Sequence, residues 1–259
     1  MGLFDKKYCD FCGKKIGLLG NKKLEDGNMC RECAKKLSPW FSDRRHTSRD
    51  EIAAQLAYRE DNRAEAAAFH TTRSIGRYMK LLLDEDHRKF TVTSERELAQ
   101  ANPDILDFSQ VTGCDLDVSE TRTELKQTDK DGNRVSYRPP RYEYSYNFHV
   151  TIHVNHPYFD EMRYSLSKGE VHTQETRMTA VPFGWRVNTF RSGSSQGERQ
   201  YYEYMDMGQE IREAVETMRA QAREEASVEP ARAVECPHCG ATTIPDENGR
   251  CEYCGSALR

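Results

Sequence analysis

Residues 142–155 read YEYSYNFHVTIHVN, and they contain the clearest secondary-structure pattern in the chain. Aromatic or branched apolar side chains occupy every even position from 142 to 154, and polar side chains occupy the odd positions. Successive side chains of a β-strand point to opposite faces, so this period of two predicts a long strand with one apolar face. His149 and His153 share the polar face, but about 13 Å along a strand separates them, too far for one metal ion.

Two hairpins are predicted on the N-terminal side of this strand. Residues 80–84 and 89–93 are strand-like runs that flank a short polar turn. Residues 121–128 and 134–137 flank a loop that contains Asp131-Gly132, and Asp-Gly between strand-like runs is a strong hairpin signal.

The remaining central segments predict further strands, a loop and a helix. Residues 105–118 predict a further long strand, and residues 162–166 continue the alternation after a turn. Residues 170–198 are polar and irregular, which indicates either an exposed functional loop or an insertion, with an extra hairpin around Trp185. From residue 200 to 226 apolar residues recur at spacings of three and four, which predicts a helix laid against a sheet or barrel. The fold class predicted is therefore α+β, an antiparallel barrel or sheet with a C-terminal helix over residues 72–226.

A separate helix is predicted nearer the N-terminus, as a connector over residues 47–71. Ser48 and Glu51 have the spacing of a capping box, which marks a helix start. Its apolar side is narrow and its other residues are mostly charged, so most of its surface is expected to be solvated. Asn62 is expected to divide it into two pieces.

Cysteines supply the firmest chemistry. Eight of the nine form CxxC pairs, which are Cys9 with Cys12, Cys30 with Cys33, Cys236 with Cys239, and Cys251 with Cys254. Each CxxC turn presents two thiolates, and two such turns complete the tetrahedron that Zn²⁺ prefers. Gly13, Gly240 and Gly255 follow three of these turns, where a positive φ is useful.

The sequence therefore predicts two structural Zn²⁺ ions, one in each of two small ribbons at residues 1–40 and 235–259. Disulfides are the rival interpretation, and an intracellular chain disfavours them. Four thiolates leave no open position for a catalytic water, so the ions are expected to be structural. The ribbons are expected to lack an apolar core and therefore to depend on metal for folding. A linker at residues 227–234 is expected to let the second ribbon move.

Three other side chains that could bind a metal are not expected to do so. Cys114 shares a strand face with Leu116 and Val118, so we expect it to be buried and unreactive. His46 and His238 lie near the ribbons, but four cysteines already complete each site. Both histidines are therefore expected to be surface side chains.

Composition limits the class of protein. The 259 residues are 37% hydrophobic and 31% charged, with a net charge of −4 and a mean hydropathy of −0.87. This is more polar than an average domain, but 23 Phe and Tyr residues are enough to build a core. The chain has neither an apolar run of membrane-spanning length nor a secretory start. A cytoplasmic protein without a transmembrane segment is expected.

The run CDFCGKKIGLLGNKKLEDGNMCRECAKKLSPWFSDRR resembles a family of bacterial proteins of unknown function that begin with a zinc ribbon. The likeness continues through Ile105–Cys114, through Pro139–Tyr142 and into the C-terminal ribbon, over nearly the whole chain. It implies zinc at the four N-terminal cysteines, the bacterial cytoplasm and no assigned activity. The middle of the chain also looks like a pleckstrin-homology-type domain, a likeness of fold that carries no function.

Three functions remain open. The first is a non-enzymatic adaptor or scaffold that binds a protein partner, because no phosphate-binding loop, hydrolase elbow or metalloprotease motif is present. The alternative is nucleic-acid binding by the N-terminal ribbon, where residues 1–40 contain nine Lys or Arg against five acids. The third is attachment to a membrane surface through Arg134, Arg138 and Arg141. The oligomeric state is not encoded in any motif.

Overall fold

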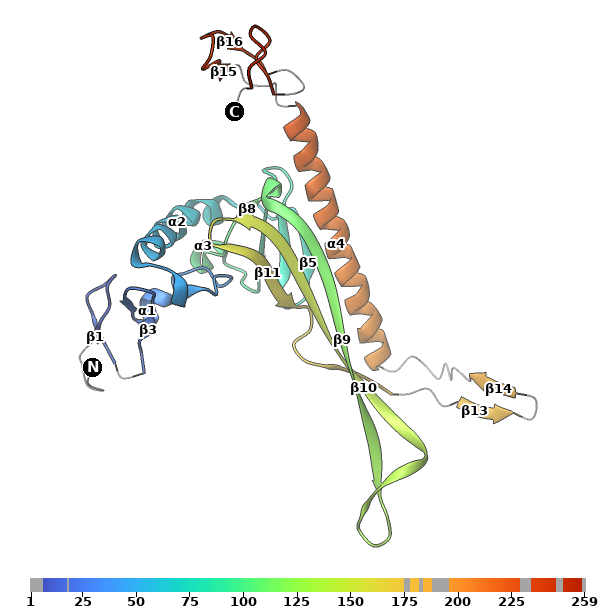
Figure 1. Cartoon of the computed structure of the whole chain (residues 1–259). Coiled ribbons are helices and arrows are strands. Elements are labelled where there is room, and N and C mark those ends of the chain that lie inside the picture. The colour runs from blue at the N-terminus through green and yellow to red at the C-terminus, as the bar shows by residue number, and fades with distance from the viewer. Residues whose placement is uncertain are drawn as a thin grey trace. The chain divides into compact units, whose positions relative to one another are not determined.

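The computed structural model describes residues 7–17, 19–174, 178–181, 184–187, 196–228, 234–245 and 249–257 (Figure 1). The chain divides into two compact units, residues 1–219 and residues 220–259. The mixed α+β class, the antiparallel sheets and the C-terminal helix are all confirmed. The described strands form open sheets rather than a closed barrel, so the likeness to a pleckstrin-homology-type domain is not confirmed.

Two four-stranded antiparallel sheets form the centre of the first unit. The first has the order β5 (Arg73–Gly76), β6 (Lys80–Asp84), β7 (Lys89–Thr93), β8 (Leu106–Asp107). In the second, one long strand pairs with three others; its strands are β9 (Val111–Thr128), β10 (Arg134–His156), β11 (Phe159–Ser165) and β12 (Val171–Gln174). Both predicted hairpins, β6–β7 and β9–β10, are therefore present.

The helices are α1 (Arg31–Ala34), α2 (Arg49–Ala68), α3 (Leu98–Ala101) and α4 (Gln196–Val228), with short 3-10 turns η1 (Arg44–His46) and η2 (Phe108–Gln110). The single strand predicted over residues 105–118 is wrong, because η2 separates β8 from β9. Side chains of Asp107 and Gln110 form a capping box around this turn, which explains the interruption.

Strand β10 builds the core as its alternation predicted. Phe148, Val150 and Ile152 are fully buried beneath α4. The Phe148 ring lies 5.4 Å from that of Tyr201 on the helix, measured between centroids. Further along α4, a Cβ added at Gly208 would lie only 2.6 Å from Leu116 Cδ1 of β9. Helix and sheet are therefore in direct contact at this glycine.

Helix α2 differs from its prediction in two respects. It is continuous through Asn62, and its capping box at Ser48 and Glu51 is formed as expected. The surface expected to be solvated is partly buried, because Gln55, Arg59 and Asn62 are each no more than 7% exposed. Asn62 does not break the helix because its side chain is used elsewhere, in bonds to the segment that follows α3.

A buried polar cluster joins α2 to residues 102–105. Arg59 Nη1 donates to Asp104 Oδ1 at 2.7 Å, with side-chain exposures of 8% and 0%. Asn62 donates to the carbonyl of Pro103 at 2.7 Å and accepts from the Ile105 N–H at 2.9 Å. Asn102 adopts a left-handed conformation, φ 50°, that closes α3 and turns its backbone into this cluster.

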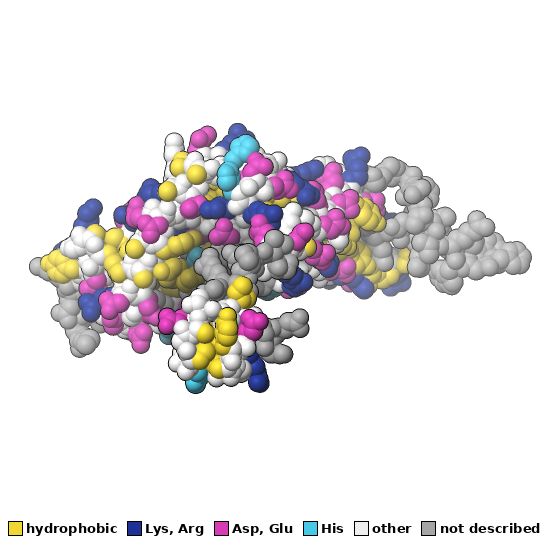
Figure 2. All heavy atoms as spheres, turned by 90° about the horizontal axis from the view of Figure 1, so that it is seen from above, with side chains coloured by type: hydrophobic (Ala, Val, Ile, Leu, Met, Phe, Trp, Pro, Cys, Tyr) yellow, Lys and Arg dark blue, Asp and Glu magenta, His cyan; other side chains and the backbone are white. Residues whose placement is uncertain are grey.

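The segment expected as an irregular loop over residues 170–198 contains the predicted extra hairpin. Its strands are β13 (Met178–Val181) and β14 (Gly184–Val187), and Trp185 lies opposite Ala180. Other parts of that segment lie outside the described residues. On the face seen in Figure 2, basic and acidic side chains are interspersed among the described residues, without a large patch of one sign.

Candidate metal centres

The N-terminal cysteines meet in one cluster. Two small hairpins, β1 (Lys7–Tyr8) with β2 (Lys15–Ile16) and β3 (Lys22–Lys23) with β4 (Asn28–Met29), bring the CxxC turns together. The sulfurs of Cys9, Cys12, Cys30 and Cys33 all lie within 4.8 Å of one another. Cys12 Sγ and Cys30 Sγ are 3.7 Å apart. Tetrahedral Zn²⁺ with bonds of about 2.3 Å sets its sulfurs about 3.8 Å apart, so the cluster has the size of a zinc site.

Backbone geometry aims these sulfurs inward. Gly13 has φ 67°, and its N–H donates to the Cys9 carbonyl at 2.8 Å, which closes the first knuckle. The Cys30 side chain caps α1 by accepting from the Cys33 N–H, and Cys9 Sγ accepts from the Cys30 N–H at 3.3 Å. Burial alone would raise the pKa of Cys9, but N–H donors led by that of Cys30 lower it to about 6. Cys9 is therefore the sulfur that most readily becomes a thiolate, whereas burial and the neighbouring sulfurs raise the pKa of Cys33.

The C-terminal cluster repeats this design. Strands β15 (Val234–Glu235) and β16 (Thr242–Thr243) flank its first knuckle. The sulfurs of Cys236, Cys239, Cys251 and Cys254 lie within 4.8 Å of one another, with Cys236 and Cys254 3.6 Å apart. Gly240 and Gly255 both have positive φ, 72° and 71°, as predicted for tight knuckles. Each cluster can hold one metal ion, and together they fit two structural zinc ions.

The N-terminal ribbon shares its hydrophobic core with α2. Leu24 and Met29 of the ribbon are fully buried in one cluster with Ile52 of the helix, and Leu56 packs against it. The end of the ribbon is also bonded to α2, because Arg59 Nε donates to the Lys36 carbonyl at 3.3 Å. The expectation that this ribbon lacks an apolar core is therefore wrong, since the helix supplies part of one.

Comparison with known proteins finds one likeness. Residues 7–55 match a family model described as a domain of unknown function, DUF4428. No curated protein and no solved structure matches the chain. The match supports the expected N-terminal zinc ribbon, but it covers only this part of the nearly full-length resemblance. Its last residues lie inside α2, beyond Ile52, so the matched region contains the shared core of ribbon and helix.

The other potential ligands lie where they were expected, with one exception. His46 and His238 are exposed and are not members of either cluster. His153 bonds to Asp115 at 2.8 Å rather than joining His149 at a metal site. Cys114, expected to be buried, is half-buried on β9; burial still raises its pKa to about 11, so it is protonated at neutral pH. Within the described residues, no helix has the length and apolarity needed to span a membrane.

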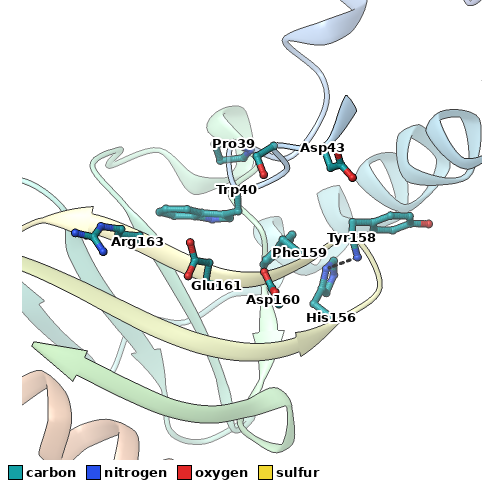
Figure 3. Close-up of a pocket in the computed structure, with 10 residues that line it drawn as sticks. Pro39, Trp40, Asp43, His156, Tyr158, Phe159, Asp160, Glu161 and Arg163 are labelled. Carbon is teal, nitrogen blue, oxygen red and sulfur yellow. Dashed lines mark hydrogen bonds between the residues drawn. The ribbon is translucent and has the colours of Figure 1, made fainter. Parts of the chain in front are cut away.

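Sequence reasoning missed a cavity beside the N-terminal ribbon. It holds about 490 Å³ and lies between residues 39–43, which leave the ribbon, and residues 156–163 of β10 and β11 (Figure 3). Its walls are more than 100 residues apart in the chain, so no local pattern could predict it.

Each cysteine cluster is expected to bind one zinc ion independently. The purified protein should contain two equivalents of zinc, and Cys9→Ser or Cys236→Ser should each reduce this to one, because three thiolates hold zinc much more weakly. Metal analysis of the three proteins after dialysis against a weak chelator measures this. Cys114→Ser is the matched control and should retain both ions. Retention of two equivalents by either cluster variant would contradict the assignment.

Proposed function

We propose that this chain is a non-enzymatic adaptor, a zinc-stabilised protein that docks a protein partner through the β9–β10 hairpin. The carrying observation is the arm, defined as residues 124–142, where the hairpin extends past the end of β12 and no third strand among the described residues pairs with it (Figure 1). None of its residues is buried. An isolated two-stranded hairpin is at best marginally stable in water, so burial in a core does not account for the length of the arm.

Local interactions order the tip and the base of the arm, which flank a bulge between Ser136 and Arg141. Asp129 at its tip accepts from the N–H groups of Asp131 and Asn133 at 2.9 and 2.8 Å, which fixes the turn. Near its base, the Arg122 guanidinium lies 3.8 Å from the centroid of the Tyr142 ring, and Arg141 lies 4.5 Å from that of Tyr137. Arg and Tyr are the residue types that most often carry binding energy at protein interfaces. The two stacked pairs therefore hold Arg and Tyr side chains in fixed positions on the arm.

The charge of the arm favours a protein over a membrane surface. Arg134, Arg138 and Arg141, considered for lipid headgroups, lie on the arm and are exposed. The same arm also contains Lys126 and Lys130, and the acids Glu124, Asp129 and Asp131 are interspersed among these cations. Anionic membranes bind clusters of positively charged side chains. A surface with both positive and negative side chains is better matched by a protein of complementary charge.

Removing the arm should abolish partner binding without unfolding the protein. Replacing the whole arm, residues 124–142, by Asn-Gly joins Thr123 to Glu143, which face each other across the ladder, through a two-residue turn and removes both stacked pairs. Stability should change by less than about 1 kcal/mol, because no buried side chain is removed. Capture of partner from nuclease-treated lysate of the source cells, quantified by mass spectrometry, should fall at least tenfold. Tyr202→Ala, an exposed residue of α4, is the control. Undiminished capture by the shortened protein would reject the arm as the docking element.

Nucleic-acid binding is the second candidate, and the β1–β2 hairpin favours it. Tyr8 is 54% exposed and lies opposite Lys15, with Lys7 and Lys14 beside them. An exposed ring flanked by lysines can stack a base and neutralise phosphates. Omitting nuclease from the same capture provides the test. Nucleic acid recovered by the intact protein and lost in Tyr8→Ala with Lys15→Ala would favour this function over the adaptor.

A further inference from the structure

The cavity beside the N-terminal ribbon has an aromatic wall and an acidic floor. The indole of Trp40 lies above β11, and the carboxylate of Glu161 extends toward it from the strand (Figure 3). Asp160 and Asp43 also line the space. A flat ring beside carboxylates is the arrangement that binds an organic cation, because the ring face and the carboxylates are both negative.

The positive groups in the lining do not neutralise this charge. Arg163 is held by Asp117 of β9, with Nη2 donating to Oδ2 at 3.3 Å. Burial lowers the pKa of His156, so its imidazole is neutral at pH 7. Among the described residues, neither Asp160 nor Glu161 forms an ion pair. The lining therefore carries a net negative charge, which a cationic ligand would complement.

A second observation points to a polypeptide rather than to a small amine. The indole N–H of Trp40 is buried and meets no acceptor within the described part of the chain. A buried donor without a partner costs about 1–3 kcal/mol. A peptide carbonyl brought in beside a basic side chain would supply the missing acceptor after a small shift of the indole.

The ribbon itself builds this wall. Leu37 is buried in the ribbon core, and the next residue, Ser38, donates to Asp104 Oδ2 at 2.8 Å. The backbone N–H of Trp40 then donates to Ser38 Oγ at 3.1 Å. The indole is therefore positioned by the ribbon on one side and by the buried polar cluster on the other.

We propose that this cavity binds an arginine side chain of a basic segment in a partner protein. The planar guanidinium stacks on Trp40 and forms paired hydrogen bonds with Glu161, a combination that lysine matches less well. This inference rests on the adaptor function proposed above and gives the adaptor a second docking point, distinct from the arm.

Fluorescence of Trp40 tests the inference directly. A Trp185→Phe background leaves Trp40 as the one tryptophan. Titration with the peptide acetyl-Gly-Ala-Arg-Ala-Arg-Ala-Gly-amide should change its emission to saturation. The same peptide with citrulline in place of arginine, which keeps the shape and lacks the charge, should bind at least tenfold more weakly. Free arginine should also bind at least tenfold more weakly, because it lacks the peptide carbonyls.

Variants separate the cavity from other acidic surfaces. Glu161→Gln should weaken the peptide at least fivefold, and Glu252→Gln, an exposed acid of the C-terminal ribbon, should leave its affinity unchanged. Equal binding of the citrulline peptide, no response to the arginine peptide, or full affinity in Glu161→Gln would each overturn the proposal. The protein without the arm should bind this peptide normally, because no arm residue lines the cavity. Loss of partner capture through the arm, together with absence of peptide binding, would therefore reject the cavity while leaving the adaptor function standing.

Discussion

Loss of the N-terminal zinc ion should loosen α2 and the Trp40 wall as well as the ribbon. In Cys9→Ser, the ribbon loses a metal whose binding to small zinc modules supplies about 10–16 kcal/mol of apparent folding energy. Ile52 and Leu56 then lose the apolar partners that cover them. The first half of α2 and residues 38–43 should therefore lose order together with residues 7–37.

Hydrogen exchange followed by mass spectrometry measures the extent of this loss. Protection in residues 7–59 should fall to near that of an unfolded chain, while β6, β7 and β10 keep theirs because their core is made of Phe90, Phe148 and Ile152. Trp40 emission in the Trp185→Phe background should shift to the red as the indole becomes solvated. Cys236→Ser is the matched control, with loss of protection confined to residues 234–257.

Two outcomes would contradict this expectation. Unchanged protection over residues 49–59 would mean that the ribbon is a separable module, as its small size alone suggests. Collapse of protection in β10 would mean that the metal supports the central sheets as well. The intermediate result is expected because the ribbon shares a core with α2 but contributes no strand to either four-stranded sheet.

Local patterns account for much of this fold. The alternation over residues 142–154 predicts β10 because each side chain's face depends only on its own position in the strand. Asp-Gly predicts the β9–β10 turn, and the CxxC spacing predicts both clusters, because a turn or a knuckle is made from adjacent residues. All of these features are decided within about 25 residues of chain.

The features that sequence analysis missed depend on distant partners. Arg59 and Asn62 have the pattern of a solvated helix face. They are buried because their side chains form hydrogen bonds with Asp104 and Asn102, 45 and 40 residues away. Cys114 has the pattern of a core residue but sits at a margin where charged Arg212 and Glu216 of α4 approach it. Trp40 and Glu161 reach one cavity from segments that share no periodicity.

The buried pair of Arg59 and Asp104 predicts the largest effect of a single substitution outside the cysteines. Asp104 also accepts from Ser38 and from the Tyr58 hydroxyl, at 2.8 and 3.3 Å, so one carboxylate holds the ribbon exit and α2 together. Asp104→Ala would leave the Arg59 guanidinium buried without its counter-charge. Breaking such a pair typically costs about 3–5 kcal/mol, which is a large part of the stability of a domain.

Urea unfolding of the zinc-loaded protein, followed by circular dichroism, should show this cost as a lower midpoint. Glu60→Ala removes a salt bridge of similar length on the same helix, 2.7 Å to Arg63, whose side chains are 60% and 52% exposed. It should cost less than about 1 kcal/mol, because water solvates the freed charge. The double variant Arg59→Met with Asp104→Leu should recover much of the loss, since neither buried charge remains. If Asp104→Ala proved no more harmful than Glu60→Ala, the cluster would contribute little to holding the ribbon, and the Trp40 wall would have to be positioned by the metal site alone.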